Sequence, residues 1–274
     1  MRITQGEKGA RFRALHEQPG TFVIPNPWDA GSARILDGMG FKALATSSAA
    51  AASALGRRDH GLTREQALAE AQRIVDATEL PVSGDLGNGF GDAPITVAKT
   101  VQLAADIGLV GCTIEDATGN PDRLLYDTTL AVERIAAAVE AARALPFDFI
   151  VTARAHGLLY DGGSLDRVIE RLQAFERAGA DVLFAPGLPD LPAVRAVCAA
   201  VTAPFNFMVG FRGASFPVHE LAAAGVKRIS VATSLYRAAM AGFLRAASEI
   251  KEQGQFSFVD SCVTTAELNT LMNI

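Results

Sequence analysis

The sequence has few cysteines and no long apolar run, and both absences exclude common classes of protein. Its three cysteines, Cys112, Cys198 and Cys262, are far apart and odd in number, so neither a disulfide framework nor a CxxC metal site is indicated. No apolar run approaches the roughly 20 residues that span a bilayer, and the N-terminal segment has no signal-peptide core. We therefore expect a cytoplasmic protein with no membrane partner.

The sequence also lacks an excess of charge of one sign. Its 25 basic and 30 acidic residues give a net charge of -5, which does not favour a nucleic-acid partner. Hydrophobic residues make up 49% of the 274 residues, enough to form a full core. Because no Pro/Gly/Ser-rich linker divides the chain, we expect one domain over residues 1–274, with residues 254–274 as a C-terminal extension.

Several catalytic signatures are missing as well. No GxSxG nucleophile elbow is present, and the four histidines form neither an HxH nor an HExxH zinc pattern. A Schiff-base aldolase needs a lysine at the mouth of its site, but no lysine ends a predicted strand. Lys42 and Lys227 precede strands and are therefore expected on the opposite face.

What the sequence does contain is an alternation of short apolar runs and helical segments, which predicts a (β/α)₈ TIM-type barrel rather than an open sheet. The predicted strands are Phe22–Ile24, Ala43–Ser47, Val82–Asp85, Gly111–Glu115, Phe149–Arg154, Val182–Ala185, Phe205–Val209 and Arg228–Ala232. The predicted helices are Thr63–Thr78, Thr129–Ala144, Leu165–Ala178, Phe216–Ala224, Ser234–Glu252 and, in the extension, Thr265–Asn273.

Polar residues at the carboxyl ends of the strands are candidates for the active site, because barrel enzymes bind their substrates there. Asp85 and Glu115 end neighbouring strands, where two carboxylates would suit Mg²⁺. Equally, they would cap helices or pair with arginines. Arg154 ends another strand and suits a substrate carboxylate or phosphonate. The alternative is a structural pair with Glu115 or Asp85, and both roles can hold together.

Other candidates lie in the loops that follow the strands. Thr46, Ser47 and Ser48 precede a run of small residues that lets a ligand approach the backbone, although they would equally start a helix. His156 follows Arg154 by two residues and is expected to face the mouth, although a lone histidine is more often structural. The glycine-rich stretch 84–92 has no P-loop lysine, so we interpret it as close backbone packing around a site.

Taken together, these segments resemble the isocitrate lyase / phosphoenolpyruvate mutase superfamily. The resemblance runs from about Phe22 to Phe258, through PNPWDAGSARILDGMGFKALATSS, GRRDHG, PVSGDLGNGFGD, GCTIED and VTARAHG in that order. It implies a homotetramer that exchanges a C-terminal helix between subunits. It also implies Mg²⁺, with Mn²⁺ as the alternative, and a small 2-oxo or 2-hydroxy acid or a phosphonate as substrate. The metal and an anion site would stabilise an enolate.

The resemblance further implies roles for single residues. Asp85 matches the direct metal ligand, Glu115 the acidic residue in the outer shell of the metal, and Asp59 the loop aspartate that reaches the metal through water. Ser47 and Ser48 match the cradle for the substrate carboxylate, and Arg154 matches the arginine that contacts substrate. We therefore predict Asp59, Glu115 and Arg154 as catalytic residues. The predicted substrate-binding residues are Thr46, Ser47, Ser48, Arg154 and His156.

Three departures from the family pattern bear on the reaction. Gly87 stands where the family has a second aspartate, which leaves a thinner metal shell. Ala117–Asp127 lacks the lysine and cysteine of the KKCGH loop, which argues against isocitrate and methylisocitrate lyase activity, and the Lys-x-Asn-Ser gating loop of the phosphonate enzymes is also missing. His60, His156 and Tyr126 are the candidate proton donors or acceptors.

We predict a Mg²⁺-dependent carbon-carbon lyase that acts by lysis or decarboxylation on a small 2-oxo or 2-hydroxy acid. Decarboxylation is the simplest variant, because it needs little acid chemistry beyond metal and anion binding. The alternatives are a phosphonate P–C mutase or hydrolase on the same scaffold, and a metabolite-binding protein that has lost catalysis.

Overall fold

The strands form where the sequence has its short apolar runs. The computed structural model describes residues 3–160 and 162–272, and eight of its strands are parallel and form one sheet. They are β1 (Phe22–Ile24), β2 (Leu44–Ala45), β3 (Val82–Asp85), β4 (Gly111–Glu115), β7 (Ile150–Arg154), β8 (Val182–Phe184), β9 (Phe205–Met208) and β10 (Arg228–Ser230). Every one coincides with a predicted strand or lies inside it, because apolar runs of this length favour parallel strands buried on both faces.

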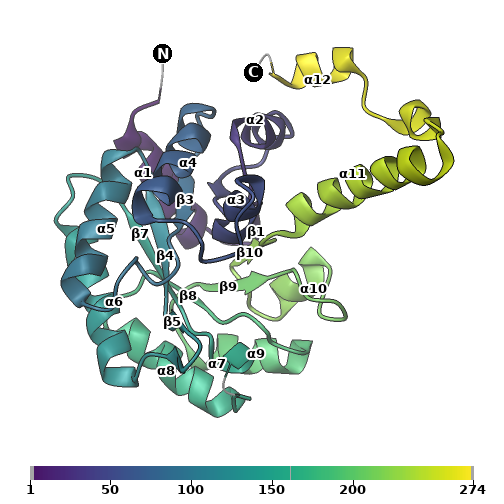
Figure 1. The fold of residues 1–274 in the computed structure, drawn as a ribbon. Helices are drawn as coiled ribbons and strands as arrows, with labels where there is room; N and C mark the ends of the chain where they lie inside the picture. The colour runs from purple at the N-terminus through teal and green to yellow at the C-terminus, as the bar shows by residue number, and fades with distance from the viewer. Residues whose placement is uncertain (1–2, 161, 273–274) are drawn as a thin grey trace.

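The sheet curves into a nearly closed barrel (Figure 1). Neighbouring strands pair in the order β1-β10-β9-β8-β7-β4-β3-β2, so β1 and β2 form the two edges. Hydrogen bonds bridge these edges: the Ala45 amide donates to the Pro25 carbonyl over 3.0 Å, and the Asn26 side chain donates to the Thr46 carbonyl over 3.0 Å. The predicted TIM-type barrel is therefore confirmed.

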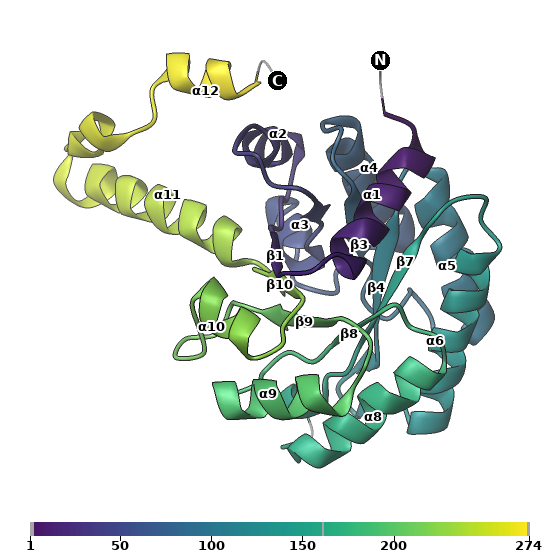
Figure 2. The same cartoon turned by 180° about the vertical axis from the view of Figure 1, so that it is seen from behind.

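Helices surround the barrel (Figure 1 and Figure 2). They include α2 (Ala30–Gly38), α4 (Arg64–Asp76), α5 (Pro94–Asp106), α6 (Thr128–Arg143), α8 (Leu165–Arg177), α9 (Leu191–Ala200) and α10 (Val218–Ala223), while α3 (Ser48–Ala54) and α7 (Gly157–Tyr160) directly follow strands. By contrast, α1 (Gln5–Glu17) packs across the amino ends of the strands, where Phe12 joins Ile24, Val110 and Ile150 in a buried cluster. The carboxyl ends are thus the end available for a site.

Local sequence signals set several helix ends. The predicted capping box is present at the start of α4, where the Thr63 hydroxyl accepts the Gln66 amide over 3.3 Å. Gly179 follows α8 with a φ of 93°, a conformation that suits glycine and ends helices. Helix α10 begins at Val218 and not at the predicted Phe216, because Pro217 disfavours helical backbone in the residue before it.

Some elements were not predicted, namely helices α1, α2, α5, α7 and α9 and one hairpin. The hairpin consists of β5 (Ala117–Asn120) and β6 (Arg123–Leu125), which pair antiparallel in the segment expected to be a loop. Its two strands have only four and three residues. They are too short to show the alternation of apolar and polar residues that identifies a strand in a sequence.

The C-terminal part leaves the barrel and returns to it (Figure 1). Helix α11 (Ser234–Gln253) projects outward, the 3₁₀ turn η1 (Ser257–Ser261) reverses the chain, and α12 (Thr265–Met272) reaches α2. There the Arg34 guanidinium donates to the Met272 carbonyl over 2.9 Å. The predicted end of this last helix, Asn273, lies outside the described residues. Within the described ranges, no helix is both long and apolar enough to cross a membrane.

Candidate active site

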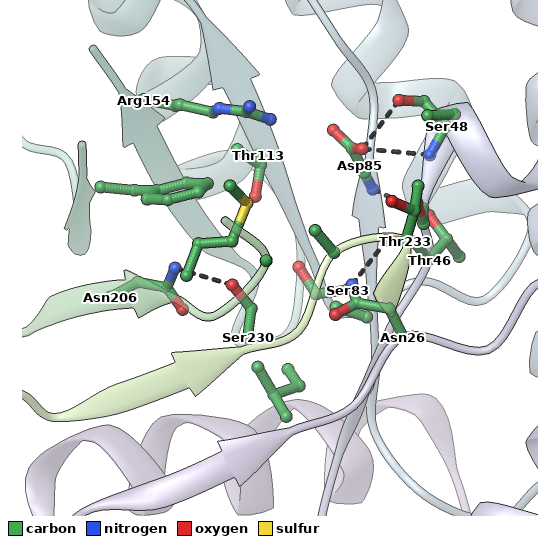
Figure 3. A pocket seen from close by; sticks show the side chains of 18 of the residues that line it. Asn26, Thr46, Ser48, Ser83, Asp85, Thr113, Arg154, Asn206, Ser230 and Thr233 are labelled. Atoms are coloured by element: carbon green, nitrogen blue, oxygen red, sulfur yellow. Dashed lines mark hydrogen bonds between the residues drawn. The ribbon is translucent and has the colours of Figure 1, made fainter. Parts of the chain in front are cut away.

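A cavity of about 260 Å³ extends from the carboxyl ends of the strands into the barrel. Most of the residues that line it are polar or charged, whereas barrels of this type usually fill their interior with branched aliphatic side chains. Ten of the residues that line it are labelled in Figure 3: Asn26, Thr46, Ser48, Ser83, Asp85, Thr113, Arg154, Asn206, Ser230 and Thr233. An interior kept polar and partly open indicates space for a polar ligand rather than a packed core.

Asp85, at the end of β3, lines this cavity. Its Oδ2 accepts two hydrogen bonds from Ser48, from the amide over 3.0 Å and from the hydroxyl over 2.8 Å. The other oxygen, Oδ1, is buried without a hydrogen-bond partner. The Asp85 amide donates to Thr46 Oγ1 over 2.8 Å, which fixes the end of the strand. Asp85 is thus a rigidly held carboxylate with one free oxygen.

The predicted cradle residues surround Asp85, but their polar atoms are already engaged. The hydroxyl of Ser47 caps α3 by accepting the Ala50 amide over 3.3 Å. Ser48 directs both its amide and its hydroxyl at Asp85. Both of the alternatives left open by the sequence are therefore visible in the structure: these residues start a helix, and they also line the cavity.

Glu115, Arg154 and His156 form a buried cluster at the ends of β4 and β7. Glu115 Oε2 lies 3.4 Å from Arg154 Nη1 and 3.1 Å from His156 Nε2, while Glu115 Oε1 has no hydrogen-bond partner. Burial raises the pKa of Glu115, but His156 and Arg154 outweigh it and lower that pKa to about 2. Glu115 is therefore ionised at neutral pH.

Within this cluster, only Arg154 lines the cavity. Its guanidinium stacks over the ring of Phe184 at 4.8 Å, and in Figure 3 it points toward the side of the cavity that holds Asp85. His156 lies behind it, 3% exposed and stacked on Tyr160 at 5.2 Å. The structure thus places the predicted substrate-binding arginine on the cavity and the predicted histidine next to Glu115.

Asp59 lies at the rim of the cavity in an exposed loop. Its Oδ1 accepts the amide of the neighbouring His60, whose backbone has a positive φ of 59°. His60 itself lines a second cavity of about 260 Å³ that also contacts Gly87, Asn88 and Thr118. The structure therefore brings Asp59 to the same mouth as Asp85, but not into direct contact with it.

Tyr126, the third candidate proton donor, lies away from this cavity and holds the hairpin against the loop after β3. Its hydroxyl donates to Asp92 over 2.6 Å and accepts from Asn88 over 3.2 Å. Burial raises its pKa to about 12. Arg134 stacks 4.0 Å from the same ring and donates to the carbonyls of Asn88, Gly91 and Asp92. This supports the interpretation of the glycine-rich stretch as packed backbone.

Among the cavity residues that the sequence analysis did not single out, Arg228 is buried and charged. Arg228, at the start of β10, lines the deep part of the cavity and is 3% exposed. Its guanidinium contacts Asn206, Thr152 and His16, all of them uncharged at neutral pH. The only available signal was a charged residue at the first position of an apolar strand, which is where such residues usually reach solvent.

Residues 12–251 match the family described as phosphoenolpyruvate phosphomutase. The chain belongs to this family. Among its relatives, 2-methylisocitrate lyase of Escherichia coli (strain K12) is 32% identical over 97% of this chain and 92% of that protein. A Burkholderia cenocepacia J2315 structure provisionally described as a lyase/mutase is 50% identical, with a TM-score of 0.96 over 98% of this chain and 97% of that one.

A third similar protein extends the comparison to another lyase of the family. The structure of 2,3-dimethylmalate lyase is 29% identical, with a TM-score of 0.87 over 97% of this chain and 94% of that one. Because the matched relatives are named lyases, the prediction of a carbon-carbon lyase of the isocitrate lyase and phosphoenolpyruvate mutase type is confirmed.

The donor atoms at the mouth fit a hard divalent cation such as the one that the family pattern implies. Asp85 Oδ1 and Glu115 Oε1 are buried oxygens without hydrogen-bond partners, and Mg²⁺ is commonly held by one or two carboxylates and water. A Cβ added at Gly87 would meet open space, so nothing occupies the place of the second aspartate. In the described part of the chain, no three His, Cys, Asp or Glu side chains gather as a metal site. The arrangement fits an ion that has few protein ligands and is otherwise coordinated by water.

Proposed function

We propose that this enzyme is a Mg²⁺-dependent lyase that breaks a carbon-carbon bond in a small 2-oxo or 2-hydroxy carboxylic acid. The observation that carries the proposal is one cavity with a free oxygen of Asp85 on one side and the guanidinium of Arg154 on another. When bound, Mg²⁺, or Mn²⁺ in its place, would neutralise negative charge on the carbonyl or hydroxyl oxygen of the acid.

Arg154 supplies the anion-binding half of this site. Its guanidinium donates in a planar fork that matches a carboxylate, and Phe184 and Glu115 hold that fork in place. Because the side chain is only 15% exposed, a carboxylate bound to it would leave bulk water. Fixed donors in a water-poor cavity stabilise charge that develops as the bond breaks.

Asp85 and Glu115 have different tasks in this proposal. Asp85 has one oxygen without a hydrogen-bond partner that would bind the metal, because Ser48 binds the other. Glu115, ionised and paired with Arg154, orients the guanidinium and would hold water of the outer shell of the metal. Asp59, at the rim, would reach the metal through water.

The lining residues favour a reaction that needs little proton transfer. Along this cavity, the described residues include no cysteine, lysine or histidine. Loss of CO₂ from a 2-oxo acid with a carboxylate at C3 sends the electron pair of the broken bond to an enolate, which water can protonate. We therefore propose decarboxylation as the simplest variant, with lysis to two smaller acids as the other.

A panel of acids tests the proposal directly. The protein is incubated with Mg²⁺ and oxaloacetate, 2-methylisocitrate, 2,3-dimethylmalate or phosphonopyruvate, and products are followed by NMR. Pyruvate or another 2-oxo acid should appear, and EDTA should abolish its formation. Consumption of phosphonopyruvate alone would contradict the proposal in favour of the phosphonate alternative. Binding without any product would favour a metabolite-binding protein.

We also propose that the chain forms a homo-oligomer, a tetramer by its resemblance to the family. None of the residues of α11 is buried, and Phe243 and Leu244 are each more than 60% exposed. Large apolar side chains left in the open mark a surface that another subunit covers. Light scattering should give a mass near four chains, and Phe243→Glu with Leu244→Glu should shift it toward one.

A further inference from the structure

Arg228 carries a buried charge without a carboxylate beside it. Its side chain lies inside the barrel at the deep end of the cavity, on the opposite side from the mouth. Within the described ranges, no Asp or Glu lies within ion-pair distance of its guanidinium. Burying an isolated charge in a protein is strongly unfavourable, so such residues are normally paired or serve a ligand.

The partners of Arg228 are all neutral hydrogen-bond acceptors. Nε donates to Asn206 Oδ1 over 2.7 Å, Nη2 donates to Thr152 Oγ1 over 3.0 Å, and Nη1 lies 3.4 Å from His16 Nε2. Burial lowers the pKa of Arg228 to about 9, which still leaves it charged at neutral pH. These contacts orient the guanidinium but do not neutralise it.

His16 is held in the state that keeps Arg228 charged. Its Nδ1 lies 2.8 Å from the Phe12 carbonyl, and because a carbonyl can only accept, Nδ1 carries the proton. Burial and the neighbouring charge of Arg228 lower the pKa of His16 to about 3, so the ring is neutral and Nε2 has a lone pair. The helix that closes the amino end of the barrel therefore supplies an acceptor and no counter-charge.

The guanidinium also retains donors that these contacts do not use. An arginine has five N–H groups, and three partners engage three of them. The cavity beside it carries Asn206 and Ser230, which are hydrogen-bonded to each other over 3.0 Å. The deep end of the cavity thus offers a fixed positive charge with spare donors and a polar wall.

We propose that Arg228 is a specificity-determining residue, which binds a second anionic group of the acid at the deep end of the cavity while Arg154 binds the first near the mouth. The inference rests on the proposed function in one respect, that this cavity binds a small acid. The two arginines differ in the charge that they offer to the ligand. Arg154 is already paired with Glu115, whereas Arg228 has its full charge available.

Two four-carbon acids that differ at one end test this assignment without any turnover. Succinate has a carboxylate at both ends, and butyrate has a methyl group in place of one of them. Calorimetric titration of the full-length protein should show succinate binding about 10- to 100-fold more tightly than butyrate, the range expected for a charge-assisted hydrogen bond. Equal affinity for the two acids would overturn the proposal.

Asn206→Asp is the sharpest variant, because it gives Arg228 an internal carboxylate at the position of Oδ1 without removing the arginine. Succinate should then lose its advantage over butyrate, while affinity for butyrate changes little. Arg228→Met should have the same effect. If Asn206→Asp folds and keeps the succinate preference, Arg228 is only a structural link between strands and the proposal is wrong.

Arg195→Met is the matched control for Arg228→Met. Arg195 is exposed on α9 and does not line the cavity, so the substitution removes an equal charge where water and salt screen it. It should leave the succinate preference within about twofold of the unaltered protein. Loss of the preference in this control too would point to a general charge effect and contradict the assignment to Arg228.

The titration also separates this proposal from the proposed reaction. A succinate preference that depends on Arg228, in a protein that turns over none of the acids in the panel, would contradict the lyase reaction alone. Turnover of an acid without any effect of Asn206→Asp on acid selection would contradict the role of Arg228 alone.

Discussion

Two arginines of the cavity, Arg154 and Arg228, differ in the side chains that they contact. Arg154, near the mouth, has a carboxylate 3.4 Å away and an aromatic ring beneath it. Among the residues that the structure describes, Arg228, at the deep end, has only neutral partners. The charge of a paired arginine is largely cancelled by its carboxylate partner, so the arginine acts mainly as a positioned hydrogen-bond donor. An unpaired arginine keeps a net positive charge that attracts anions. In the proposals made above, the mouth therefore balances charge around a cation and an anion together, and the deep end attracts an anion.

The largest effect is expected from removing the carboxylate that faces Arg154 across the mouth. Asp85→Ala takes away the free oxygen that the metal would use, and turnover should fall on the order of 10³-fold, since metal polarisation contributes several kcal/mol. Initial rates at saturating Mg²⁺ measure it. Asp122→Ala, an exposed aspartate of the hairpin, is the control and should keep full activity. Metal-dependent activity surviving Asp85→Ala would show that the site is wrong.

Glu115→Gln removes the carboxylate partner of Arg154. It therefore leaves Arg154 unpaired, as Arg228 is at the deep end. Residues that orient a metal's ligands and waters typically change activity by about 10- to 100-fold, so kcat should fall by that much. KM should fall or stay constant, since the freed Arg154 binds the substrate carboxylate at least as well. Separate determination of kcat and KM checks this. A rise in KM with kcat unchanged would mean that Glu115 contacts substrate itself.

This contrast also explains which parts of the molecule a sequence predicts. The strands were predicted because buried parallel strands are continuous apolar runs, and Asp85, Glu115 and Arg154 were found because they interrupt those runs at the carboxyl end. Arg228 interrupts its run at the amino end, where charged residues usually meet water. Only the placement of α1 over that end shows that the residue is buried.

The cradle residues and the hairpin mark a second limit. The sequence places Ser47 and Ser48 near a ligand, but the hydrogen bonds that they make, to the helix start and to Asp85, depend on how β2 and β3 lie side by side. Likewise, Tyr126 was a candidate for proton transfer, yet it is bound to Asp92. Tertiary packing decides which hydrogen-bond partner each of these side chains takes. The pattern of a single sequence does not reveal that packing.

The deep end of the cavity should also give the stability of the protein a pH dependence of its own. His16 beside Arg228 has a folded-state pKa of about 3 against 6.5 for the free side chain, so the unfolded chain binds the extra proton first as the pH falls. Stability should therefore be unaffected above pH 6.5 and decline between 6.5 and 3, by at most about 1.4 kcal/mol per pH unit. Urea unfolding of the protein and of His16→Gln isolates this contribution. Identical pH profiles for the two proteins would contradict the neutral, buried state of His16.

The smallest effect is expected from Asn206→Asp at the deep end. Unlike most core substitutions, it should stabilise the protein. Asn206→Asp turns a charged-to-neutral hydrogen bond into an ion pair with Arg228 and should raise the free energy of unfolding by about 1 kcal/mol at neutral pH. Denaturant midpoints measure it, with Asn206→Ala as the control that should destabilise by removing the acceptor. If Asn206→Asp destabilises the protein, the positive charge of Arg228 is already compensated, and the contrast between the two arginines does not hold.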